Sequence, residues 1–291
     1  AAKYSLESID LLISKIQNEV AIEGFKQERD RVQNELSRGD LEVVVFGTGS
    51  SGKTSLIRAL LKKIVGDTGP SMGSTSKSNT YRIRLKNLDR GIRIIDTPGI
   101  LEGGKEGRLR EKEALVKASR ADLMIVVIDS DLRESEFKII KSLALVGKRL
   151  FLVLNKIDLR GLEEERHLLA KLRGRTKALI QSEDIISITA SPQTIPQPGL
   201  RPIQPQPEID KLVRRLARVL YEDGEELLSD NILLQCRNLG NKGRTILNSQ
   251  REIIARKSIE KYSWICSGVV AITPLPGVEL LGTAAVNTQM V

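Results

Sequence analysis

Apolar runs alternate with amphipathic segments through the middle of the chain. The runs within 41–46, 123–128 and 150–154 are rich in Val, Ile and Leu, which is typical of strands buried on both faces of a sheet. Apolar residues at helical spacing over 134–146 predict a helix between two of these strands. Because strands that alternate with helices favour a mostly parallel sheet covered on both faces, the pattern predicts a three-layer α/β domain.

Further segments complete this pattern. Apolar and basic residues alternate over 81–86, which predicts a half-exposed strand, and a turn at 87–91 leads to a strand at 92–95. A last strand is expected at 185–188. The remaining helices of the domain are expected at 55–65 and 162–181, and a mobile loop rich in Gly, Ser and Thr at 67–78.

Before the first strand, apolar residues recur every three or four positions. They are Leu6, Ile9, Ile13, Ile16 and Val20. This spacing predicts one apolar stripe on a helix. We expect residues 1–39 to pack within the chain, either on the following domain or on another helix, because the stripe is too short for the sustained heptads of a coiled-coil dimer.

The first strand leads directly into the sequence Gly-Thr-Gly-Ser-Ser-Gly-Lys-Thr at 47–54. This spacing is typical of a phosphate-binding loop between a buried strand and a helix. Its glycines allow backbone amides to turn inward without obstruction by a Cβ atom, so these amides and the helix N-terminus converge on one anion. Lys53 would neutralise the β and γ phosphates, and the Thr54 hydroxyl would bind Mg²⁺. The expected nucleotide contacts of this loop are Gly47, Gly49, Ser50, Ser51, Gly52, Lys53, Thr54 and Ser55.

The strand at 92–95 ends in the sequence Asp-Thr-Pro-Gly at 96–99. A carboxylate at a strand end can hold Mg²⁺ through water, and a glycine amide can contact a γ-phosphate. Asp96 is therefore a candidate magnesium-site residue, and Gly99 is a candidate sensor of the nucleotide state. Three glycines follow within 103–107, which favours a loop that moves when the γ-phosphate leaves.

Two more strand ends carry candidate base-recognition groups. The Asp158 carboxylate, in the sequence Asn-Lys-Ile-Asp at 155–158, can accept hydrogen bonds from N1 and N2 of guanine, which adenine cannot offer. The stem of Lys156 would lie along the base plane, and the backbone of residues 189–191 would contact guanine O6. The expected base-binding residues are Asn155, Lys156, Asp158, Thr189, Ala190 and Ser191.

With these four motifs in this order, residues 40–191 resemble a small GTPase domain of the translation-factor-related class, nearest the Era-like and dynamin-like branches. The resemblance implies GTP or GDP and Mg²⁺ as ligands, and hydrolysis of GTP to GDP and phosphate. It also implies that Thr75 is the switch threonine that reaches Mg²⁺ and the γ-phosphate, with Thr68 and Thr80 less favoured. The expected catalytic residues are then Lys53, Thr75 and Gly99, and the expected metal-site residues are Thr54, Thr75 and Asp96.

Two positions depart from this family pattern. Ile100 stands where Ras-like members carry the glutamine that orients the attacking water. We therefore expect slow intrinsic hydrolysis unless an activating partner, a homodimer or another loop supplies a group; Arg108 and Arg110 are candidates, although solvated surface arginines are the favoured interpretation. Ser50 stands where several potassium-stimulated relatives have Asn and dynamin-like members have Ser, so cation-assisted hydrolysis stays open. Ile100 also leaves open a scaffold that holds GTP with little turnover.

The chain continues beyond the nucleotide-binding motifs. Residues 192–207 contain six of the ten prolines, which predicts a stiff extended connector or the padding of a loop. An amphipathic pattern over 208–222 predicts the closing helix of the GTPase domain. Residues 223–291 are expected to be helical and to end in an apolar hairpin, as an accessory α-helical region.

Charge narrows the partner classes. The net charge is +9 and the pI about 9.5, so we expect an anionic partner, either nucleic acid or an anionic membrane surface. Basic residues concentrate over 237–261, where seven stand against two glutamates. His167 is the only histidine, which excludes histidine-based acid/base or metal chemistry. Cys236 and Cys266 fit no metal or redox spacing, which favours a reducing compartment.

Two uncharged segments, 264–278 and 280–291, follow Tyr262 and lie around a Pro-Gly turn. Each is shorter than the roughly 20 residues that a helix needs to span a bilayer. With their basic flank they favour a hairpin that enters one leaflet, the alternative being soluble core. Residues 273–291 resemble the apolar domain of unknown function attached to GTPases of the YcjF-like membrane family. The resemblance implies a peripheral or monotopic protein of the cytoplasm or the plastid stroma.

RNA binding is the rival hypothesis. The sequence Gly-Asn-Lys-Gly at 240–243 has the Gly-x-x-Gly form with which KH modules clamp RNA, and Era-like GTPases can carry such a module at this end. A KH domain also contains strands, and no alternating strand pattern occurs over 230–265. We therefore interpret 240–243 as a helix break with two glycines, and RNA as the less favoured partner.

Overall fold

The computed structural model divides the chain into two compact units, Asn34–Gln235 and Ala1–Gln33 together with Cys236–Val291. The structure describes residues 2–16, 19–48, 50–65, 80–84, 91–97, 115–197, 201–272, 284–285 and 288.

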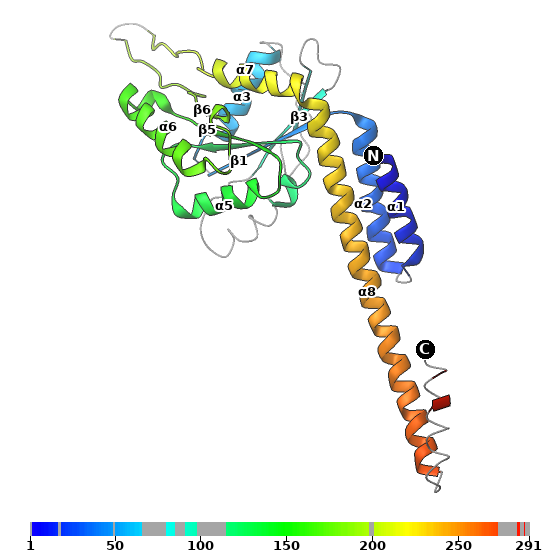
Figure 1. Cartoon of the computed structure of the whole chain (residues 1–291). Coiled ribbons are helices and arrows are strands. Elements are labelled where there is room, and N and C mark those ends of the chain that lie inside the picture. The colour runs from blue at the N-terminus through cyan, green and yellow to red at the C-terminus, as the bar shows by residue number, and fades with distance from the viewer. Residues whose placement is uncertain are drawn as a thin grey trace. The chain divides into compact units, whose positions relative to one another are not determined.

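A six-stranded sheet forms the centre of the larger unit (Figure 1). The strand order is β2-β3-β1-β4-β5-β6, and only β2 runs antiparallel to its neighbour. The predicted mostly parallel sheet is thereby confirmed. The strands are β1 Leu41–Gly47, β2 Thr80–Arg84, β3 Gly91–Asp96, β4 Leu123–Ile128, β5 Arg149–Leu154 and β6 Ile185–Ser187.

Helices cover both faces of this sheet, with α3 and α7 on one face and α5 and α6 on the other. Every side chain of β4 is buried, because β4 lies inside the sheet and helices cover both of its faces. The predicted helix at 162–181 ends at Thr176, before a short 3-10 helix at Ser182–Asp184. The helices are α3 Lys53–Val65, α5 Glu134–Ala144, α6 Leu162–Thr176 and α7 Asp210–Glu222.

The proline-rich segment folds back on itself. Thr189 pairs with Glu208 and Ile195 with Ile203, both antiparallel. Since its two ends lie together, the segment is a loop of the GTPase domain, and the extended-connector interpretation is wrong. The alternative prediction, that these residues pad a loop, describes the segment.

The smaller unit is helical. It contains α1 (Ala2–Lys15), most of α2 (Glu19–Arg38) and most of α8 (Gly224–Ile272). The predicted N-terminal stripe therefore spans two helices. Arg29 of α2 donates to both carboxylate oxygens of Asp10 of α1 at 2.9 and 2.8 Å, and this carboxylate raises the pKa of Arg29. Lys242 of α8 pairs with Glu28 at 3.2 Å.

Helix α8 passes through residues 240–243 without interruption. The predicted helix break is therefore wrong, and so is a KH loop at this position. A Cβ atom at Gly243 would lie 3.2 Å from Phe25, whereas one at Gly240 would meet nothing within 4 Å. Glycine at 243 thus allows two helices to approach closely. Among the described residues, no helix has a stretch long and apolar enough to cross a membrane.

Candidate functional site

The phosphate-binding loop connects β1 to α3, as predicted from the sequence. The ammonium of Lys53 is buried and donates to the main-chain oxygens of Gly47 and Thr48 at 3.3 and 2.5 Å. The Ser51 hydroxyl also donates to Thr48 O, at 3.0 Å. A buried cation held by carbonyl groups inside a turn of backbone amides is suited to bind an oligophosphate.

Gly52 leaves no room for a side chain. Its φ is 89°, and a Cβ atom there would lie 2.3 Å from Nδ2 of Asn155. The loop therefore needs glycine at this position for both conformation and space.

The predicted magnesium-site residues Thr54 and Asp96 lie together. The Thr54 hydroxyl donates to Oδ2 of Asp96 at 2.9 Å. The other carboxylate oxygen, Oδ1, is buried and has no hydrogen-bond partner in the described part of the chain. A hydroxyl and a carboxylate beside a phosphate loop fit Mg²⁺, which prefers oxygen ligands and keeps several waters. Thr97 fixes the end of β3 by donating to Val45 O at 2.7 Å.

Asn155 connects the phosphate loop to the base-recognition loop. Its Nδ2 donates to Ser51 O at 2.8 Å, and its Oδ1 accepts the amide of Ala190 at 3.0 Å. The side chain is 2% exposed. Asn155 therefore holds two parts of the site in register and is a positioning residue.

Lys156 adopts the left-handed conformation, with φ 62° and ψ 39°. It is the one non-glycine residue with a positive φ among the described residues. Its ammonium pairs with Asp129 at 2.8 Å, and Arg160 donates to the main-chain oxygens of Lys156 and Asp129. The sequence did not indicate these roles of Asp129 and Arg160, because the contacts join separate loops.

Of the predicted base-binding residues, Ala190 and Ser191 line a pocket of about 360 Å³, together with Ser55 and the proline-rich loop. Thr189 is buried beside them. The Asp158 carboxylate accepts a hydrogen bond from the main-chain amide of Gln193 at 3.2 Å. This bond connects the predicted base-selecting residue to the proline-rich loop.

Several predicted positions lie outside the described residues. They are Gly49, Thr75 and Gly99, together with Ile100, Arg108 and Arg110. Ser50 is described and exposed. The switch and catalytic assignments at these positions stay predictions.

The sheet order, the loop between β1 and α3 and the Thr54–Asp96 pair define the class as a P-loop GTPase fold. The buried ammonium of Lys53 and the oxygens of Thr54 and Asp96 fit GTP or GDP with Mg²⁺ as ligands. Residues 42–156 match the family model described as 50S ribosome-binding GTPase, and residues 234–291 match a domain of unknown function, DUF697. The resemblance of the C-terminus to a domain of unknown function is thus supported over a longer range than the sequence pattern indicated.

Curated relatives agree with this class. The tRNA modification GTPase MnmE of Thermoanaerobacter sp. (strain X514) is 30% identical over 173 residues, which cover 57% of this chain and 33% of the relative. GTPase Der of Nautilia profundicola is 28% identical over 120 residues, 40% of this chain and 26% of the relative. The chain therefore spans about a third or less of the length of these relatives.

Among solved structures, Era of Aquifex aeolicus bound to GDP and aluminium fluoride is similar at a TM-score of 0.45 and 21% identity. The similarity covers 61% of this chain and 56% of that one.

Proposed function

We propose that this protein hydrolyses GTP to GDP and phosphate and acts as a nucleotide-dependent switch at an anionic membrane surface. The main observation behind the enzymatic part is that Lys53, Thr54 and Asp96 lie together at the phosphate-binding loop. When bound, Mg²⁺ neutralises charge on the phosphates. Lys53 would bind the phosphates, and Asn155 would keep the loop aligned with the base site.

Turnover of GTP by the purified chain tests the enzymatic part. Lys53→Ala removes the buried cation, so GTP affinity or turnover should fall by about tenfold or more. Lys138→Ala, at an exposed position of α5, is the matched control. Turnover equal in both variants would overturn the assignment. GTP binding without turnover would favour the scaffold alternative.

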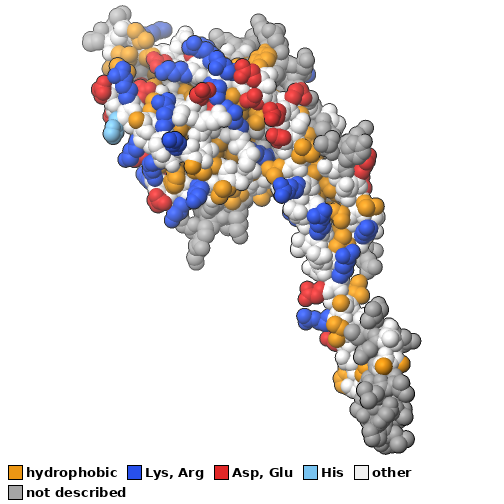
Figure 2. All heavy atoms as spheres, viewed as in Figure 1, with side chains coloured by type: hydrophobic (Ala, Val, Ile, Leu, Met, Phe, Trp, Pro, Cys, Tyr) orange, Lys and Arg blue, Asp and Glu red, His pale blue; other side chains and the backbone are white. Residues whose placement is uncertain are grey.

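The membrane part of the proposal is supported by the exposed end of α8. None of residues 251–268 is buried. Trp264 is 80% exposed, and Ile253, Ile254 and Ile259 are 50–55% exposed. Figure 2 shows hydrophobic and basic side chains on the same visible surface of this part of α8. Exposed apolar residues between basic ones are typical of helices that lie in a lipid interface.

Co-flotation with vesicles tests this part. The full chain should float with phosphatidylserine-containing vesicles and not with pure phosphatidylcholine vesicles. The fraction of protein that floats should differ between the GTP-bound and the GDP-bound chain. The double variant Trp264→Ser and Ile259→Ser should lose flotation. Leu145→Ser, which removes a leucine that is 72% exposed in the other unit, should keep it. Equal flotation of both variants would contradict the assignment to α8.

Ribosome or RNA binding is the second candidate. The family description for residues 42–156 names the 50S ribosome, and the chain is basic. Co-sedimentation with 50S subunits, without flotation in any nucleotide state, would favour this candidate over the membrane.

A further inference from the structure

Strand β6 is the last strand of the sheet, and within the described part of the chain it pairs only with β5. Leu152 lies opposite Ile185 and Leu154 opposite Ser187, and the amide of Ile188 donates to Leu154 O at 2.8 Å. In this parallel register, the main-chain groups of Ile185 and Ser187 point away from β5. They form the open edge of the sheet.

Part of this edge is already paired, and part is not. The next outward-facing residue, Thr189, exchanges two main-chain hydrogen bonds with Glu208 at 3.1 and 2.9 Å. By contrast, the amide and carbonyl of Ser187 and the carbonyl of Ile185 have no partner among the described residues, although these residues are 6% and 2% exposed. Main-chain groups in such a buried position are nearly always paired. The edge therefore has unused capacity for a strand.

A groove of about 520 Å³ opens beside these groups. Helix α6 forms one wall and α7 the other, and β6 lies between them. Leu162 and Leu169 of α6 line it with apolar surface. Leu162 is 73% exposed. Such a groove suits a chain with an apolar side chain at every second position.

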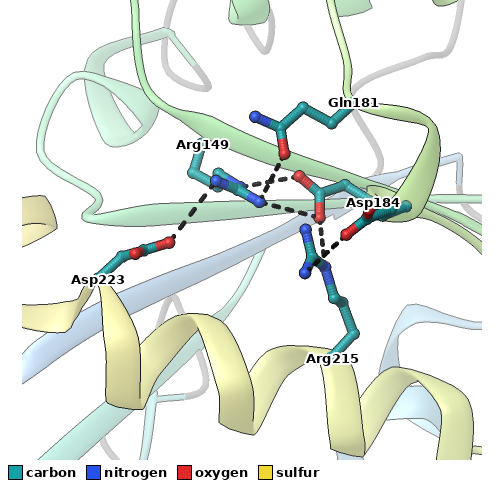
Figure 3. A network of polar contacts seen from close by, with 6 residues as sticks. Arg149, Gln181, Asp184, Arg215 and Asp223 are labelled. Carbon is teal, nitrogen blue, oxygen red and sulfur yellow. Dashed lines mark hydrogen bonds and ion pairs between the residues drawn. The ribbon is translucent and has the colours of Figure 1, made fainter.

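The groove lining carries more positive than negative charge, with four cations against two carboxylates. Arg173 of α6 and Lys211 of α7 line the groove, and neither has a carboxylate partner among the described residues. Three of the other four groove-lining charges, Arg166, Glu183 and Arg215, form ion pairs. Arg215 binds Asp184 at 2.9 Å and Glu183 at 3.0 Å, as part of the network in Figure 3. Glu165 accepts a hydrogen bond from the hydroxyl of Ser187 and keeps its negative charge, and Arg166 pairs with Glu163.

We propose that this groove binds an extended acidic segment of a partner protein, which adds a strand to the open edge at Ser187. The main-chain groups would hold the segment, and Arg173 and Lys211 would select acidic side chains. A second copy of the same edge is disfavoured because its own cations would face these two. This inference does not depend on the membrane proposal.

The test uses the full chain and a labelled, blocked peptide of about eight residues with alternating Glu and Val. Fluorescence anisotropy should report saturable binding that weakens with salt. A peptide with Lys in place of Glu should not bind. Methylation of alternate peptide nitrogens, which removes main-chain donors but keeps the charges, should weaken binding by about tenfold. The Ser187 amide should gain protection from hydrogen exchange.

Protein variants localise the binding. Charge reversal by Arg173→Glu and Lys211→Glu should weaken binding by about tenfold or more. The matched pair Lys177→Glu and Arg218→Glu changes two exposed cations outside the groove and should have little effect. Affinity for a fluorescent GDP analogue, equal to that of the unchanged chain, shows that both variants are folded.

Four results would overturn the proposal: no binding of the acidic peptide, equal binding of the methylated peptide, equal binding by the two charge-reversed pairs, or displacement of the peptide by a single-stranded RNA oligomer. Concentration-dependent dimerisation that the peptide blocks would identify a second copy as the occupant and would also overturn it.

Discussion

Gly52 illustrates how tightly single residues constrain the nucleotide site. Because a Cβ atom would lie 2.3 Å from Nδ2 of Asn155, Gly52→Ala must displace that amide and release Ser51 O and Ala190 N. We expect a loss of about 1–3 kcal/mol of stability from backbone strain alone, and weaker GDP binding. Thermal unfolding with and without GDP measures both effects.

Gly174→Ala is the matched control for this substitution. Gly174 lies inside α6, and a Cβ atom there meets nothing within 4 Å. Alanine should stabilise the helix by about 1 kcal/mol. Equal behaviour of the two alanine variants would contradict the role assigned to Gly52.

Base selection can be tested at Asp158. A carboxamide can donate to the additional oxygen of xanthine but cannot accept two hydrogen bonds from guanine, so Asp158→Asn should shift preference from GTP toward XTP, by about tenfold or more. Competition between the two nucleotides measures the shift, with Asp210→Asn as a control at an exposed carboxylate that pairs with Lys63. Retained selectivity for GTP would count against base recognition by Asp158.

At the scale of residues, the sequence identified the groups that follow strand ends. Lys53, Thr54 and Asp96 could be placed together because parallel strands end at one edge of a sheet. The two-sided role of Asn155 and the pairing of Lys156 with Asp129 could not be predicted, since each depends on contacts between loops far apart in the sequence.

At the scale of elements, the pairing of α6 with the loop after β4 gives a pH-dependent contact. Asp131 pairs with Lys171 at 2.6 Å and with Arg175 at 3.4 Å. The hydrogen bond from Lys171 lowers the pKa of Asp131. The stability from this contact is therefore present above the unfolded-state pKa of about 3.9, and it is lost as the pH falls through the lower folded-state pKa.

Asp131→Asn removes the charge but keeps an acceptor for the amide of Leu132. The melting temperature should fall slightly at neutral pH, and its dependence on pH below about 4 should become shallower. Glu163→Gln alters an exposed ion pair within α6 and should change neither. A pH profile of Asp131→Asn parallel to that of the unchanged chain would contradict the assignment.

Elements were predictable wherever the apolar period was regular. All six strands were expected from apolar runs or alternation. The course of α8 through Gly243 was not, because glycine suggests a helix end unless the neighbouring helix is known. Phe25, 218 residues earlier in the sequence, occupies the space that a side chain at 243 would need.

At the scale of the whole molecule, the charge of +9 predicts that the proposed membrane binding depends on salt. If basic side chains around Trp264 contact anionic lipids, flotation should fall markedly between about 0.05 and 0.5 M NaCl, because the Debye length shortens several-fold. Residual flotation at high salt would measure the apolar contribution. Flotation of the unchanged chain that does not respond to salt would argue against electrostatic attraction.

The left-handed backbone of Lys156 has a consequence for directed evolution. The left-handed conformation costs a lysine about 1–3 kcal/mol, whereas glycine and asparagine adopt it readily. A library randomised at 156 and sorted only for thermal tolerance should therefore enrich Gly and Asn. The same library sorted for capture on immobilised GTP should return Lys. The difference between the two enriched populations would separate the contribution of Lys156 to GTP binding from its cost to the stability of the fold.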